Sequence, residues 1–89
     1  MEEKTVLRQA IDVFGARAQE EKAIEELAEL ICAIAHKHCG RDANIAEEIA
    51  DVEIMLEQLK QINQCHAEVE KIRNEKVERL FDRICERCF

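Results

Sequence analysis

Proline, tryptophan and tyrosine are absent from this chain, and glycine occurs only twice, at Gly15 and Gly40. Without proline, few positions force a helix to break. Without tyrosine and tryptophan, and with only three phenylalanines, the chain lacks most of the aromatic residues that enrich β-strands. What remains is rich in Ala, Leu, Ile, Glu, Lys and Arg, which are mostly good helix formers. The composition therefore predicts an all-α protein.

Long hydrophobic runs are also absent. None approaches the roughly 18 residues needed to span a bilayer, and the opening "MEEKTVLRQ" is too charged for a secretory signal. The five cysteines are odd in number, which favours reduced thiols over a disulfide framework. We therefore expect a cytoplasmic protein that does not associate with a membrane.

Positive charge is in the minority, because the net charge is −7. This balance disfavours nucleic acid as a partner, since a nucleic-acid backbone requires a basic face. It suits a site that attracts a divalent cation.

The length of 89 residues predicts one domain, spanning 1–89. A chain this short buries a modest core, and oligomerisation is a common remedy. A homodimer or homotetramer is therefore expected.

Four helices can be drawn from the apolar spacing and the helix-terminating residues. Gly15 and Gly40 are typical of residues that end helices. The least marked boundary falls in "NQCH", where Asn63 is the only conventional turn residue. The expected helices cover 4–14, 17–38, 44–62 and 67–87.

The third helix has a candidate N-terminal cap. Asn44 is followed three residues later by Glu47, which resembles a capping box, and Asp42 is a competing cap.

Apolar residues mark the faces expected to be buried. On the second helix, Ile24, Leu27, Ile31 and Ile34 form one stripe, while Ala23, Leu30 and Ala33 lie on another side. A helix that is apolar nearly all round is usually buried from more than one direction. We expect another subunit to supply the second direction. On the third helix the expected stripe is Ile45, Ile49, Val52, Leu56 and Leu59.

Carboxylates interrupt both of these helices at matching spacing. Glu26 and Glu29 are three residues apart, as are Glu48 and Asp51, so each pair shares a helix face. Antiparallel packing could place the pairs opposite each other, where they would repel strongly without a cation. Oxygen ligands at this density suit Mg²⁺, Mn²⁺ or Ca²⁺, and Mg²⁺ commonly binds substrate phosphates. The alternative is an ordinary solvated acidic face.

The segments "EELAE" and "EIAD", 18 residues apart, resemble the EExxE…ExxD signature of the MazG-like all-α nucleoside triphosphate pyrophosphatases. The later segment "RNEKVERLFDRI" is similar to another segment of that family. The resemblance covers roughly 16–84. It implies an oligomeric four-helix bundle and a Mg²⁺-dependent hydrolase, with Mn²⁺ as a second candidate metal. The implied reaction is attack of a metal-activated water on the α-phosphorus of an NTP or dNTP, which releases pyrophosphate.

The resemblance also implies roles for individual residues. Glu26, Glu29, Glu48 and Asp51 match the metal-binding and catalytic acids, and Glu25 matches an additional or alternate ligand. No tryptophan or tyrosine is present to stack on the base, and Phe14 either takes that place or belongs to the core. The implied substrate-binding residues are Gln19, Lys22, Asn74, Lys76 and Arg79.

Three other classes of protein share features with this sequence. A non-catalytic helical interaction module would use the second apolar face of the second helix to dimerise or to bind a partner. Cys85 and Cys88 form a single CxxC, which is a weak zinc signal. Di-iron carboxylate bundles require Glu-x-x-His, and none of the three histidines has a glutamate three residues earlier.

Overall fold

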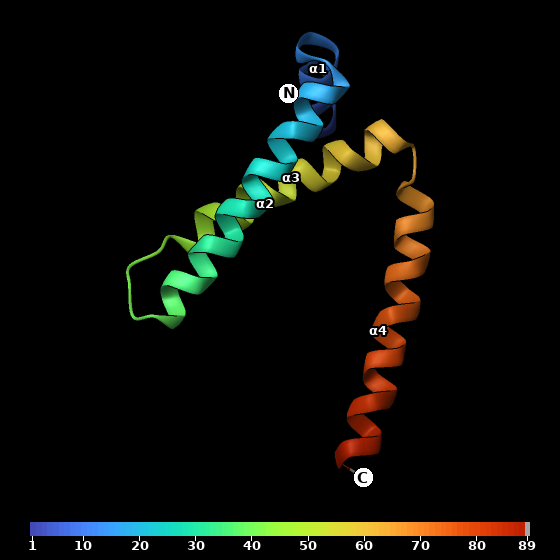
Figure 1. Ribbon diagram of the computed structural model, residues 1–89. Helices are drawn as coiled ribbons and strands as arrows, with labels where there is room; N and C mark the ends of the chain where they lie inside the picture. The colour runs from blue at the N-terminus through green and yellow to red at the C-terminus, as the bar shows by residue number, and fades with distance from the viewer. Residues whose placement is uncertain (89) are drawn as a thin grey trace.

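The computed structural model describes residues 1–88 and consists of four helices joined by short connections (Figure 1). Over these residues no strand occurs, so the all-α prediction is confirmed. The expected helix ends differ from the observed ones by at most one residue. The helices are α1 (Glu3–Phe14), α2 (Ala16–His38), α3 (Ile45–Asn63) and α4 (His66–Cys88).

Both glycines end helices, as predicted. Gly15 has φ +94°, and its backbone N–H donates to the carbonyl of Ile11 at 2.8 Å. Gly40 has φ +76°, and the following Arg41 donates to the carbonyl of His36 at 2.9 Å. Positive φ is strained for residues with a Cβ, so glycine is favoured at both positions.

Asn44, rather than Asp42, caps α3. Its side-chain oxygen accepts a hydrogen bond from the backbone N–H of Glu47 at 3.1 Å. The Asn44 amide also donates to the Glu47 carboxylate at 3.2 Å. This cap satisfies one of the free N–H groups at the start of the helix and fixes where α3 begins.

The break between α3 and α4 depends on a different residue from the one expected. Gln64 adopts the left-handed conformation with φ 51°, whereas Asn63 is the last residue of α3. The Asn63 side chain donates to the carbonyl of Leu59 at 2.9 Å. The prediction that Asn63 is the turn residue was therefore wrong, because its amide satisfies the end of the helix.

The main packing unit is an antiparallel hairpin of α2 and α3, and α1 packs against both helices (Figure 1). Ala23 and Ala33 of α2 are buried, as are Val52 and Met55 of α3. The small alanine side chains allow the two helices to approach closely. Gln58 is buried as well, and its amide donates to the backbone carbonyl of Leu7 in α1 at 3.2 Å.

The expected apolar stripe on α3 is only partly buried. Val52 lies in the core, whereas Ile49 and Leu56 are exposed, and Met55 and Gln58 take the buried positions. The stripe was misplaced because the direction of the core was set by where α1 and α2 pack, which apolar spacing alone does not specify.

On α2 the alanine side faces the core and the isoleucine side does not. Ile24 and Ile31 are 69% and 68% exposed. Phe14, at the end of α1, is also exposed, so the interpretation of Phe14 as a core residue was wrong.

Helix α4 extends away from the hairpin (Figure 1). It contacts α3 alone, and none of its described residues is buried. The radius of gyration is 16.4 Å, whereas a compact chain of this length has about 12 Å. Within residues 1–88, no helix has the length and apolar character required to cross a membrane.

Candidate metal centre

Three of the predicted carboxylates meet where α2 and α3 pack together. Glu26 and Glu29 come from successive turns of α2, and Glu48 comes from the first turn of α3. One carboxylate oxygen from each of the three lies within 4.8 Å of the others. We call these residues the carboxylate cluster. The antiparallel arrangement that brings them together is the one expected from the matching spacing of the acids.

Glu26 is the innermost member of the cluster, with 7% of its surface exposed. Its Oε1 lies 3.1 Å from the Lys22 Nζ, but its Oε2 is buried without a hydrogen-bond partner. The Oε2 of Glu48 is also buried and unpartnered. Buried polar atoms are normally satisfied, so these two oxygens indicate a missing electropositive partner. A cation coordinated by oxygen ligands fits that requirement.

The cluster raises the pKa of two of its members. The negative charge of Glu26 is the main cause that raises the pKa of Glu29, followed by burial and the charge of Glu48. For Glu48, burial is the main cause of a raised pKa, and the charges of Asp51 and Glu26 add to it. Neighbouring negative charge therefore disfavours the ionised forms of Glu29 and Glu48, and a bound cation would offset that effect.

Among residues 1–88, Lys22 is the cationic residue that forms an ion pair with the cluster. Its hydrogen bond to Glu26 is the main cause of a raised pKa of the lysine ammonium. It also lies 3.7 Å from the carboxylate of Glu25, which is exposed and outside the cluster. The contact between Lys22 and Glu26 was missed at the sequence level, although their spacing of four residues on one helix is a readable signal.

Two other predicted residues flank the cluster. Asp51 is half-buried, one turn beyond Glu48. It is outside the group of oxygens within 4.8 Å, but its charge contributes to the raised pKa of Glu48. Gln19 is half-buried one turn before Lys22 on α2.

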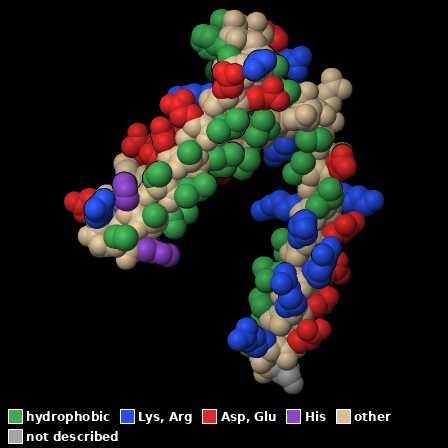
Figure 2. Space-filling model, viewed as in Figure 1, with side chains coloured by type: hydrophobic (Ala, Val, Ile, Leu, Met, Phe, Trp, Pro, Cys, Tyr) green, Lys and Arg blue, Asp and Glu red, His purple; other side chains and the backbone are tan. Residues whose placement is uncertain are grey.

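The predicted substrate-binding residues Asn74, Lys76 and Arg79 lie elsewhere. All three are exposed on α4, which makes no contact with α2. Within a single chain they are therefore not brought to the carboxylate cluster. Figure 2 shows that many Lys and Arg side chains of α4 lie on the side toward the hairpin, whereas its acidic side chains gather on the opposite side.

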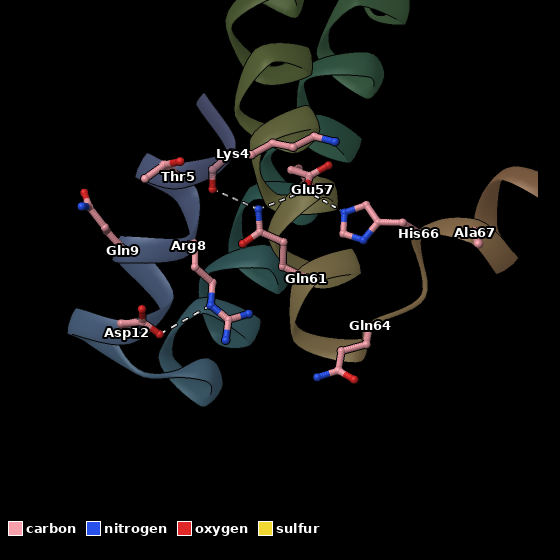
Figure 3. A pocket seen from close by; sticks show the side chains of 10 residues that line it. All are labelled: Lys4, Thr5, Arg8, Gln9, Asp12, Glu57, Gln61, Gln64, His66 and Ala67. Carbon is pink, nitrogen blue, oxygen red and sulfur yellow. Dashed lines mark hydrogen bonds and ion pairs between the residues drawn. The ribbon is translucent and has the colours of Figure 1, made fainter. Parts of the chain in front are cut away.

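An open cavity with a volume of about 820 Å³ lies apart from the cluster, where α1, α3 and the start of α4 meet (Figure 3). Its polar groups mostly bind one another. Glu57 accepts a hydrogen bond from Gln61 at 3.1 Å and lies 2.8 Å from the Nε2 of His66. The contact with His66 is the main cause of a lowered pKa of Glu57. None of the clustered acids lines this cavity. Because the contact between Glu57 and His66 joins α3 to the start of α4, we interpret the region as the junction that fixes the direction of α4.

The cysteines do not form a comparable centre. Among the described residues, the potential metal ligands that lie close together in a group of three or more are the glutamates of the carboxylate cluster. Cys85 is half-buried and Cys88 is exposed, and within residues 1–88 no third ligand joins them.

Comparisons of the chain with protein-family models, curated proteins and solved structures found no match in any of the three.

Proposed function

We propose that this protein is a Mg²⁺-dependent nucleoside triphosphate pyrophosphohydrolase, as the motif resemblance implies. The observation that carries the proposal is the carboxylate cluster, with its buried and unpartnered oxygens on Glu26 and Glu48. Two helices supply its ligands, so the site is built by the packing of the hairpin. A solvated acidic face would not require burial of Glu26.

Glu26, Glu29 and Glu48 would hold the metal. The half-buried Asp51, whose charge acts on Glu48 from the next turn of α3, is the candidate for a fourth ligand. Mg²⁺ is proposed because the ligands are all oxygens, and Mn²⁺ would be accepted for the same reason. When bound, the metal would supply charge neutralisation for the triphosphate and polarise its oxygens.

The remaining catalytic roles, which are proton transfer and contact with the phosphates, would fall to side chains of this protein. A carboxylate of the cluster, Glu29 or Glu48, can accept the proton from the attacking water. The water oxygen bonds to the α-phosphorus, and the bond from that phosphorus to the bridging oxygen breaks. The products are a nucleoside monophosphate and pyrophosphate. Lys22 lies at the cluster, where its ammonium can contact a phosphate oxygen.

The leaving pyrophosphate also needs positive charge. Lys76 and Arg79 were expected to provide it, with Asn74 assisting, and their position on α4 requires either movement of that helix or another copy of the chain.

The test is hydrolysis of a panel of NTPs and dNTPs with Mg²⁺, scored separately for pyrophosphate and phosphate. The variant Glu48→Gln removes one carboxylate charge from the cluster with little change of shape. The matched control is Glu53→Gln on the same helix, since Glu53 is exposed and outside the cluster. We expect pyrophosphate release by the wild type and by Glu53→Gln, and a loss of about 100-fold or more in Glu48→Gln.

Release of phosphate instead of pyrophosphate would contradict the proposed bond cleavage. Hydrolysis that is unchanged in Glu48→Gln would show that the cluster is not the site.

A second candidate function is a helical interaction module without catalysis. The exposure of Ile24 and Ile31 on α2 favours it, because large apolar side chains in a row are typical of interaction surfaces. If neither the wild type nor the two variants hydrolyse any nucleotide of the panel, and their helical content is intact, this second function is favoured.

A further inference from the structure

Lys22 forms an ion pair with the most buried acid of the carboxylate cluster. Its Nζ lies 3.1 Å from the Oε1 of Glu26 and 3.7 Å from the carboxylate of Glu25. The Lys22 side chain is 48% exposed, whereas the Glu26 side chain is only 9% exposed. The ammonium therefore reaches a buried carboxylate from a side that is open to solvent.

This pair differs from the ion pair that Arg17 forms on the same helix. Arg17 and Glu21 are also four residues apart, and their nitrogen–oxygen distance is 3.3 Å, but their side chains are 91% and 66% exposed. Such an exposed pair supports a helix only weakly. The pair between Lys22 and Glu26, by contrast, occupies one oxygen of the candidate metal centre.

The ammonium satisfies only part of the cluster. One positive charge faces the carboxylates of Glu26, Glu29 and Glu48, and one oxygen each of Glu26 and Glu48 stays buried without a hydrogen-bond partner. A lysine ammonium is a compact single charge on a flexible stem. A divalent cation carries twice that charge and binds several oxygens at once. Lys22 is therefore a partial substitute for such a cation.

The ion pair and a bound metal oppose each other. A cation coordinated by Glu26 would bring two positive charges beside the ammonium that contacts the same carboxylate, and like charges at short range repel. The metal therefore binds more favourably once the pair has opened. Because the lysine is half-exposed and has a flexible four-carbon stem, it can leave Glu26 without movement of α2.

We propose that Lys22 is a built-in counter-cation of the carboxylate cluster, which holds Glu26 while the site lacks a metal and weakens the binding of a free divalent cation. Lys22 is thus a positioning residue, because it acts on the metal through Glu26.

A consequence of the counter-cation rests on the proposed function. A triphosphate brings several negative charges to the cluster together with its metal, and a phosphate oxygen is a strong hydrogen-bond acceptor for an ammonium. Lys22 then exchanges its contact with Glu26 for a contact with the triphosphate. The site therefore accepts the metal more readily together with a triphosphate than alone.

The first test is the binding of Mn²⁺ without nucleotide, followed by its electron paramagnetic resonance signal. Lys22→Met removes the charge with little change in side-chain length, and we expect it to bind Mn²⁺ about 5- to 10-fold more tightly than the wild type, since solvent screens the half-exposed ammonium. Lys22→Gln removes the charge but keeps a hydrogen-bond donor, and it should also bind more tightly. Lys22→Arg retains the charge and should bind as the wild type does.

The matched control is Arg17→Met, which removes one positive charge from the same helix and so changes the net charge equally. Arg17 lies nine residues before Glu26, which is about 13 Å along a helix. Exposed charges are largely screened beyond about 8 Å at physiological ionic strength. Arg17→Met should therefore bind Mn²⁺ as the wild type does.

Equal or weaker Mn²⁺ binding by Lys22→Met and Lys22→Gln, with helical content unchanged, would overturn the proposal. An equal gain in Arg17→Met would also overturn it, because net charge alone would then explain the effect. The same holds if neither the wild type nor Lys22→Met shows saturable binding. None of these results depends on hydrolysis.

The second test asks whether the lysine exchanges its partner. Inorganic triphosphate in excess Mg²⁺ is titrated into each protein, and its binding is measured by isothermal titration calorimetry. We expect Lys22→Met to bind this probe about 5- to 10-fold more weakly than the wild type, although it binds free Mn²⁺ more tightly. A merely structural role of Lys22 would shift both affinities in the same direction.

Equal or tighter binding of inorganic triphosphate by Lys22→Met would overturn the exchange. Failure of the counter-cation and failure of the proposed function give different results. If the wild type hydrolyses nucleotides but Lys22→Met gains no affinity for Mn²⁺, the counter-cation is overturned and the proposed function stands. If Lys22→Met gains affinity for Mn²⁺ but no protein hydrolyses nucleotides, the counter-cation stands and the proposed function fails.

Discussion

The two faces of the α2–α3 hairpin differ in what each requires from outside the chain. On one face, Glu26, Glu29 and Glu48 concentrate negative charge around oxygens that have no partner. On the other, Ile24 and Ile31 expose apolar surface that water solvates poorly. We propose that a cation completes the first face and that apolar protein surface covers the second. One pair of helices can thus carry a site and an interface, because the two lie on opposite sides of it.

The largest effect expected from this comparison concerns the exposed isoleucines of α2. If folding and dimerisation are coupled, the melting temperature must depend on protein concentration. Each tenfold dilution reduces the stability of the dimer by about 1.4 kcal/mol. Over a hundredfold dilution, we expect the melting temperature measured by circular dichroism to fall by roughly 5–10 °C. A melting temperature that does not change with concentration would contradict the coupling.

A smaller effect concerns the carboxylate face. Folding raises the pKa of Glu29 and Glu48 above the ordinary value of 4.5. Their contribution to the free energy of unfolding is therefore full below about pH 4.5 and is lost as the pH rises through their folded pKa values. Glu57 acts in the opposite direction, because His66 lowers its pKa and its contribution is lost as the pH falls.

Urea unfolding of the metal-free protein between about pH 3 and pH 7 measures both contributions. Glu29→Gln should make the loss of stability above about pH 4.5 smaller, and Glu57→Gln should make the loss of stability below that pH smaller. Saturating Mg²⁺ should reverse the loss at pH 7, because metal binding competes with protons for the carboxylates. Identical pH profiles for Glu29→Gln and the wild type would show that the acids do not interact as described.

Much of the fold could be predicted because its signals are local. Gly15 and Gly40 end helices through their backbone freedom, and the side chain of Asn44 begins one. The end of α3 was less readable, because Gln64 has no intrinsic preference for the left-handed conformation it adopts. Such a position is set by the packing of the helices on either side.

The site could be predicted in part for a related reason. The spacing of Glu26 and Glu29 places them on one helix face, and the matching spacing on α3 brought Glu48 to them. Sequence did not reveal that Asp51 would stand outside the group, since this depends on the rotation of α3. Nor did it reveal that Lys76 and Arg79 would be far from the acids within one chain, because the direction of α4 depends on contacts beyond the helix itself.

The measurement that tests the central claim most directly is the binding of Mn²⁺, followed by its electron paramagnetic resonance signal, to the wild type and to Glu26→Gln. The matched control is Glu21→Gln, since Glu21 is exposed on the same helix. We predict saturable binding by the wild type and Glu21→Gln, competition by Mg²⁺, and an affinity about 100-fold or more weaker in Glu26→Gln. The metal-free Glu26→Gln protein should remain as helical as the wild type. Equal binding by all three proteins would contradict the claim that the carboxylate cluster is a divalent-cation site.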